Sequence, residues 1–273
     1  MNLDDTLRQL SANADAGFDV AELSLQLARD EYADIDVEAY LGELSGMAHE
    51  VKRYLRGGLE ARVKGLSRYL FHDMGFRGNV EDYFDPRNSY FNQVLDRRTG
   101  IPITLSAVAM AIGSRVGLRV AGIGLPGHFV AKAVEGEKEI LFDPFHGGRL
   151  LTPQDCENLV EQVTGAPFKA RPASLQAMPL RFIVQRMLNN LKGIYLRKGD
   201  FARSVRVIQR LRQLDPDDPV QERDLGVSLL QSGQPGKAID HLAAYLKTND
   251  WTAESDPIRQ LLEKARSEIS KLN

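Results

Sequence analysis

The middle of the chain contains the sequence GIPITLSAVAMAIGSR, residues 100–115, which is almost entirely apolar. Proline is well tolerated at the first position of a helix, where its missing N–H would have no partner in any case. A helix that is apolar almost all round is usually surrounded by protein. We therefore predict a buried central helix over residues 103–116, opened by Gly100-Ile101-Pro102.

Three short segments follow this helix and differ from it in pattern. They are apolar or β-branched and are bounded by glycines, prolines or charges, which is typical of strands. The predicted strands cover residues 120–124, 128–134 and 139–142. Residues 135–138 (Glu-Gly-Glu-Lys) are the predicted hairpin turn. With the turn centred near 136–137, Asp143 would lie diagonally across from His128, within side-chain reach.

The remainder of the chain is predicted to be helical. Apolar residues recur at helical spacing before the central segment and again after Pro172. The predicted fold class is α+β, with a buried helix against a small antiparallel sheet. We expect one domain over residues 1–176, with a helical layer at 1–98 and a core at 99–150, and an all-α tail over 177–273.

The tail contains an internal repeat with a period of 34 residues, which is the period of the tetratricopeptide repeat (TPR). The matching pairs are Leu191 and Leu225, Gly199 and Gly233, Ser204 and Ala238, and Ile208 and Leu242. Residues 257–271 are predicted to form an amphipathic closing helix. The alternative is two helical hairpins that share this period by chance.

Composition limits the class of protein. The chain has 273 residues, of which 43% are hydrophobic and 26% charged, as in globular proteins. It contains no apolar run long enough to span a membrane, and its acidic start does not resemble a secretory signal. Cys156 is the only cysteine, so no internal disulfide can form. We expect a cytoplasmic protein.

The small net charge of −2 hides an asymmetry. Residues 1–50 contain twelve Asp or Glu and two Arg, a balance of −10. Residues 181–213 contain nine Lys or Arg and a single acid, Asp200. This pattern fits either two solvated helix faces or an acidic head that docks on the basic tail or competes for its partner.

Two short motifs match an enzyme superfamily. The segments Gly127-His128-Phe129 and Phe142-Asp143-Pro144 resemble the histidine and aspartate strands of the transglutaminase-like superfamily. Gly100-Ile101-Pro102 lies where that superfamily has Gly-x-Cys at the start of a buried helix.

More narrowly, nearly the whole chain resembles the bacterial SirB-type family, which joins such a domain to TPR repeats. The segments that carry this resemblance are 27–32, 36–41, 85–89, 94–103, 124–129 and 143–149.

The resemblance implies a remnant of a catalytic site. His128 and Asp143 would be the proton shuttle and its orienting carboxylate. Pro102 provides no thiol and no N–H for an oxyanion, so we expect no thiol-based catalysis. Thr104, Ser106 and Cys156 are possible replacements for the nucleophile, but none has the sequence context of the lost one.

The resemblance also implies a cleft lined by polar residues. The alternative is that these residues are simply the polar, solvated face of a helix. The lining residues of the cleft would be Asn88, Asn92, Gln93, Arg97, Thr104 and His146. We expect no metal, because His128, Asp143 and His146 match no metal-binding motif. We expect no cofactor either.

The leading hypothesis is a non-catalytic interaction or regulatory protein. A groove of the TPR tail would bind a protein or peptide, and its basic residues would suit an acidic segment or a chain-terminal carboxylate. The groove residues would be Arg197, Arg203, Arg206 and Arg210. The rival is a cysteine-independent hydrolase or acyltransferase that uses His128 and Asp143. Nucleic-acid binding would depend on the tail arginines alone, and their dispersal along helices and the acidic head disfavour it.

Overall fold

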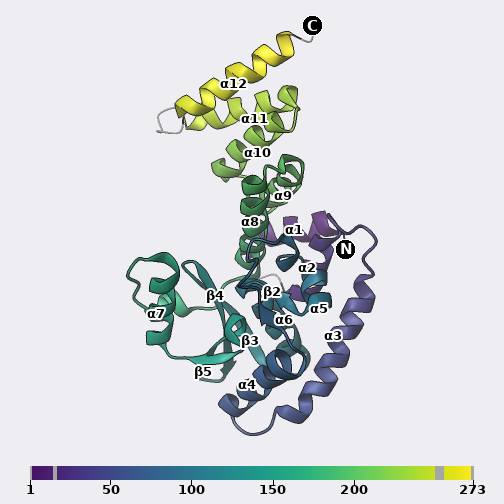
Figure 1. Cartoon of the computed structure of the whole chain (residues 1–273), viewed down its shortest axis with the longest axis vertical. Coiled ribbons are helices and arrows are strands. Elements are labelled where there is room, and N and C mark those ends of the chain that lie inside the picture. Colours follow the sequence, from purple (N-terminus) through teal and green to yellow (C-terminus); the bar gives the residue numbers. More distant parts are fainter. Residues whose placement is uncertain (1, 15–16, 250–254, 272–273) are drawn as a thin grey trace. The chain divides into compact units, whose positions relative to one another are not determined.

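The computed structural model describes residues 2–14, 17–249 and 255–271 (Figure 1). Contacts group the chain into two compact units. The mixed unit is Ala14–Met187, and the helical unit contains the residues up to Asn13 together with those from Leu188 onward. This grouping places the first residues and residues 177–187 differently from the predicted division. The predicted boundary between the helical layer and the core, after residue 98, stays a prediction. So does the predicted domain boundary after residue 176.

The mixed unit contains an N-terminal helical layer and a small sheet. Its helices before the sheet are α2 (Val20–Ala28), α3 (Val37–Val51), α4 (Leu59–Ser67), α5 (Phe91–Arg97) and α6 (Pro102–Arg115). Their apolar faces meet in one core, in which α6 is the central helix.

Helix α6 begins at Pro102, as predicted, and eleven of its fourteen residues are buried. The chain enters the helix through extended backbone at Ile101, whose N–H donates to Thr104 Oγ1 at 3.1 Å. The Thr104 hydroxyl donates in turn to the carbonyl oxygen of Asn88 at 2.8 Å. This side chain therefore ties the first turn of α6 to the preceding loop, because it satisfies backbone groups that the helix cannot.

The sheet is an antiparallel meander in the order β3-β4-β5-β6. Its strands are β3 (Arg119–Leu125), β4 (His128–Glu135), β5 (Lys138–Asp143) and β6 (Arg149–Leu151). The three predicted strands and the hairpin turn are confirmed, since Glu135 pairs with Lys138 across the turn. The sequence pattern missed β6, and it also missed a parallel pair of two-residue strands, β1 (Arg77–Gly78) and β2 (Thr99–Gly100).

Both faces of the sheet are covered in the middle. Successive side chains of a strand point to opposite faces. Accordingly, Phe129 and Ala131 of β4 belong to the core built around α6. Val130 between them belongs to a second cluster with Leu159 on α7 (Pro153–Thr164). Strand β4 is therefore a central, two-sided strand, and its first residue is His128.

The two edges of the sheet differ. Along β3, the N–H of Met178 donates to the carbonyl oxygen of Gly122 at 2.9 Å, so a returning segment of the chain covers part of that edge. The opposite edge is β6, which is only three residues long.

The helical unit contains paired helices, as the 34-residue repeat predicts. They are the end of α8 (Leu180–Lys198), α9 (Phe201–Leu214), α10 (Pro219–Gln231), α11 (Pro235–Thr248) and the closing helix α12 (Ser255–Ser270). Gly199 and Gly233 end the first helix of each pair with φ of 68° and 77°, a conformation that glycine adopts without strain. Among the residues that the structure describes, no helix has the length and apolar character needed to cross a bilayer.

The acidic head docks on the basic tail through its first helix. Helix α1 (Leu3–Ala12) packs on α9, and its Leu7 and Leu10 have no exposed surface. The carboxylate of Asp4 pairs with the guanidinium of Arg210. This pairing holds the pKa of Asp4 below its usual value, mainly through the hydrogen bond from Arg210.

Other carboxylates of the acidic head form ion pairs inside the mixed unit. Asp19 pairs with Arg115 at 3.0 Å and Glu43 pairs with Arg98 at 2.7 Å, all within the mixed unit. Ion pairs within the mixed unit therefore neutralise part of the negative charge of residues 1–50.

We predict that apolar packing holds α1 in place more strongly than charge does. Leu7→Ala should remove about 2–5 kcal/mol of packing and transfer energy, whereas Asp4→Asn removes a partly exposed ion pair of much smaller value. Hydrogen exchange of α1 amides, measured at low and high salt, checks this. Asp5→Asn is the matched control, because the ion pair of Asp5 is formed with Arg8 on the same helix. Protection of α1 that disappears in high salt would show instead that charge holds the helix.

Candidate functional site

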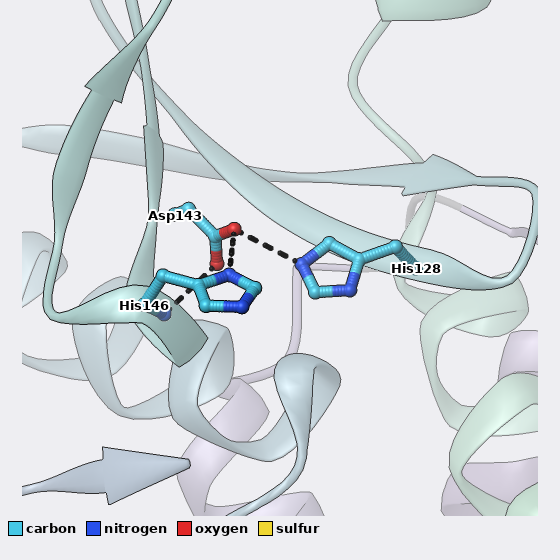
Figure 2. Close-up of side chains that lie close together, drawn as sticks. All are labelled: His128, Asp143 and His146. Atoms are coloured by element: carbon cyan, nitrogen blue, oxygen red, sulfur yellow. Dashed lines mark hydrogen bonds and ion pairs between the residues drawn. The ribbon is translucent and has the colours of Figure 1, made fainter. Parts of the chain in front are cut away.

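The site is built where β4 begins and β5 ends. The register pairs Ala131 with Phe142, so Asp143 lies one step further, diagonal to His128. The two side chains meet on the same face, with His128 Nε2 3.2 Å from Asp143 Oδ2 (Figure 2). Both are buried, with exposed fractions of 4% and 0%. The hairpin thus produces the pairing that its turn position predicts.

A second histidine joins this pair. The chain turns after Asp143 into a single 3-10 turn, η4 (Pro144–His146), which brings His146 Nδ1 to 2.7 Å from the same Oδ2 atom. Figure 2 shows both rings directed at this one carboxylate. The rings also stack, with centroids 5.7 Å apart. The cluster is therefore His128–Asp143–His146 rather than a dyad.

Asp143 is fully supplied with hydrogen-bond donors. Its Oδ1 accepts the N–H groups of Phe145 at 3.0 Å and His146 at 3.3 Å, while Oδ2 faces both rings. Burial raises the pKa of Asp143, but the hydrogen bonds from His128 and His146 outweigh it and hold the pKa well below its usual range.

The ionised carboxylate fixes the protons of both rings. An ionised carboxylate only accepts hydrogen bonds, so the ring nitrogens that face it carry hydrogens. In the neutral rings, His128 Nδ1 and His146 Nε2 are then the acceptors. The arrangement can orient a general base or bind a ligand that donates a proton.

The turn that carries His128 is held from α8 by a residue that the sequence pattern did not mark as part of the site. Arg186 donates from Nη2 to the carbonyl oxygens of His128 at 2.5 Å and Leu125 at 2.9 Å. Its guanidinium also lies over the Phe129 ring, 5.4 Å from the centroid. The only sequence signal was its place among the basic residues after 181. Arg186 is a positioning residue, because it contacts the backbone of the histidine turn.

The candidate nucleophiles are not presented to the cluster. The hydroxyl of Ser106 donates to the carbonyl oxygen of Pro102 at 2.8 Å, and the Thr104 hydroxyl is bound to Asn88. Cys156 has no exposed surface and lies in the apolar cluster under α7. Burial raises the pKa of its thiol to about 11, so it is a poor nucleophile at neutral pH.

Three of the six predicted cleft residues, Asn88, Arg97 and Thr104, make structural contacts. Asn88 is fully buried and donates to the carbonyl oxygen of Asp82 at 2.8 Å, which holds the preceding loop. Arg97 lies 3.4 Å from Asn88 Oδ1 and 3.6 Å from Asp85 Oδ2. Asn92 is buried and Gln93 is half-buried. Of the six predicted residues, His146 is the one that joins His128 and Asp143.

The predicted groove arginines of the tail have partners within the chain. Arg203 pairs with Asp200 at 2.7 Å, and Arg210 pairs with Asp4. Arg197 and Arg206 also have interactions within the chain. These contacts reduce the positive charge that the helical unit offers to an acidic ligand.

The cluster also contains three potential metal ligands. One nitrogen from each of His128 and His146 and one oxygen of Asp143 lie within 4.8 Å of one another. The ring nitrogens that face Asp143 are already hydrogen-bonded to it. The expectation of no metal stays a prediction.

Comparison with known proteins identifies both parts of the chain. Residues 38–189 match the family described as the transglutaminase-like superfamily, and residues 191–269 match a tetratricopeptide repeat family. The chain belongs to the transglutaminase-like superfamily and carries TPR repeats after that domain.

Its relatives include bacterial proteins named UPF0162 protein. The one from Xylella fastidiosa strain Temecula1 is 34% identical over 248 residues, 86% of each chain. The one from Vibrio cholerae is 30% identical over 242 residues, 88% of this chain and 86% of the other. Human F-box only protein 21 is 29% identical over 206 residues, 72% of this chain and 30% of that protein. A crystal structure of menin aligns with a TM-score of 0.43 at 10% identity over 96% of this chain and 81% of that one, a likeness too weak for any inference.

We predict that the Asp143 carboxylate stabilises the mixed unit in a pH-dependent way. Its pKa is lowered by folding, so its contribution is fully present above the ordinary carboxyl pKa near 4 and is lost as pH falls further. Asp143→Asn places an amide where both rings donate and should cost about 1–3 kcal/mol at pH 7. It should also flatten the acid limb of the stability curve.

Urea unfolding between pH 2.5 and 7 measures both effects. Glu137→Gln is the control, because Glu137 is exposed on the β4–β5 turn. Equal acid limbs for the wild type and Asp143→Asn would contradict the role assigned to this carboxylate.

Proposed function

We propose that this chain is a non-catalytic interaction protein that binds protein or peptide segments. The observation that carries the proposal is Pro102. It is the first residue of the buried helix α6, at the position where the resemblance places the nucleophilic cysteine. Loss of a nucleophile lowers the rate of such an enzyme by several orders of magnitude.

The surroundings of Pro102 support this reading. The three side chains that could replace a nucleophile are Thr104, Ser106 and Cys156, and all three are buried. The two hydroxyls are committed to backbone carbonyl oxygens. A cysteine with a raised pKa inside an apolar cluster is inert under ordinary conditions.

Binding is favoured by the second part of the chain. TPR repeats generally mediate protein interactions, and stacked repeats present extended surfaces for partners. A region that matches most of this chain also occupies 30% of human F-box only protein 21, so a larger protein carries it together with other sequence. Both observations suit a binding module.

The rival function is a hydrolase that activates water. It is favoured by the proton positions in the cluster, because Asp143 leaves Nδ1 of His128 free to accept a proton. The exposed fraction of His128, only 4%, argues against it, since a substrate and a water must both reach the ring.

We predict no turnover of peptide, amide or ester substrates above that of a His128→Ala variant. A panel of chromogenic and fluorogenic substrates, assayed with the full chain, tests this. Cys156→Ala should leave partner binding unchanged. Turnover that disappears in both His128→Ala and Asp143→Asn, with both variants folded, would overturn the proposal in favour of the hydrolase.

We further predict that a cysteine at position 102 would become reactive. Pro102→Cys, in a Cys156→Ala background, would place a thiol at the start of α6. There the helix N-terminus and, as the resemblance implies, a neighbouring His128 favour the thiolate. Its alkylation by iodoacetamide should proceed at pH 7 and slow several-fold when His128 is also replaced by Ala. Equal rates with and without His128 would show that position 102 is not the nucleophile position.

A further inference from the structure

A cavity of about 800 Å³ opens beside the histidine cluster in the mixed unit. One wall comes from α4 and the helical residues that follow it, and the other comes from the segment between η4 and β6. His146 lies at its border. The other lining residues that matter for binding are Lys64, Ser67, Arg68, Asp73, Gly148 and Arg149.

The two walls are fastened to each other. Ser67 Oγ donates to the carbonyl oxygen of Gly148 at 3.0 Å. Gly148 has φ of +73°, and a Cβ added there would lie 2.4 Å from Ser67 Oγ, so this approach requires glycine. A cavity with fixed walls loses little freedom when a ligand enters it.

The cavity carries positive charge from Arg68 and Arg149, whereas the charge of Lys64 is neutralised by an ion pair. Lys64 pairs with Glu60 at 2.6 Å, one turn earlier on α4. Arg68 lies over the Tyr54 ring at 6.0 Å, and Arg149 is exposed at the start of β6. Within the described ranges 2–14, 17–249 and 255–271, neither Arg68 nor Arg149 forms an ion pair with an acidic side chain. The charge of Arg149 does act on Asp155: after the hydrogen bonds from Thr152, it helps to hold the pKa of that carboxyl below its usual value. Asp73 is the one acid in the lining.

This distribution differs from that of the tail arginines. Arg203 and Arg210 are paired within the helical unit. The guanidiniums of Arg68 and Arg149 retain their donors for a ligand. A guanidinium binds a carboxylate with two parallel hydrogen bonds, which gives it geometric selectivity as well as charge.

We propose that this cavity binds carboxylate groups of a peptide, held by Arg68 and Arg149. The proposal rests on the proposed function and names the ligand chemistry of one binding surface. It moves the acidic-ligand site from the tail, where the sequence placed it, to the border of the histidine cluster. The carboxylates come either from Glu and Asp side chains or from a peptide C-terminus.

Four labelled octapeptides serve as probes. The first is Glu-rich with both ends blocked, and the second is neutral with a free C-terminal carboxylate. The third is neutral with both ends blocked, and the fourth is Lys-rich. Fluorescence anisotropy with the full chain at low salt should give saturable binding of the first or second probe and none of the others. The probe that binds identifies the source of the carboxylate.

Three variants locate the binding. Arg68→Ala and Arg149→Ala should each weaken it about tenfold, as expected for a lost charge-assisted hydrogen bond. Asp73→Asn removes the repelling acid and should tighten binding several-fold, an effect that misfolding cannot produce. Arg119→Ala is the matched control, because Arg119 is exposed on β3, at the other edge of the sheet. It should change nothing.

Three outcomes would overturn the inference. They are no saturable binding of either carboxylate probe, binding that Arg68→Ala and Arg149→Ala leave unchanged, and displacement by millimolar phosphate but not by acetate. None of these touches the proposed function, which is overturned by a different result, turnover that depends on His128. The two results are therefore separable.

Discussion

The mixed unit depends on one buried carboxylate. Asp143 has no exposed surface, yet it is ionised, because two imidazole and two backbone N–H groups donate to it. Those four donors belong to β4 and to η4. An isolated charge in such a place would be very unfavourable. The start of β4, the end of β5 and the turn that follows are consequently fixed relative to one another around a single side chain.

This constraint gives the cluster a structural role that does not depend on catalysis. The same hydrogen bonds that would orient a catalytic histidine also satisfy a charge inside the fold. A protein that no longer uses the histidine chemically would still be destabilised by losing it. The presence of His128 and Asp143 in a chain with proline at position 102 is thus no argument for enzymatic activity. Stability provides a sufficient reason for their pairing.

Much of the fold followed from local patterns in the sequence. The apolar segment after Pro102 predicted α6, and the 34-residue period predicted the helical pairs. Short apolar or β-branched segments bounded by glycines, prolines or charges predicted β3 to β5. The His128–Asp143 pairing was predictable because hairpin register follows from turn position. Strands β1, β2 and β6 are two or three residues long, too short for any periodicity to appear.

Other features depend on tertiary contacts that no local pattern encodes. Arg186 reaches the histidine turn from 58 positions away in the chain, and Asp4 reaches Arg210 from 206. The partners of such long side chains depend on how the helices and strands pack, which the local sequence does not specify. The number of charges in the tail is therefore clear from the sequence, but which of them are neutralised by ion pairs within the chain is not. In the structure, Arg203 and Arg210 of the tail form ion pairs, so Arg68 and Arg149 of the mixed unit become the better candidates for binding a carboxylate.

The two edges of the sheet have a consequence for solubility. An open strand edge presents unpaired N–H and C=O groups that can recruit a strand from another molecule. Here the β3 edge is partly covered by the segment at Met178, and the β6 edge is three residues long and begins with the exposed Arg149. Neither edge offers a long, flat, apolar template. The mixed unit is thereby guarded against growth into intermolecular sheets, even though six of the eight residues of its central strand β4 are buried.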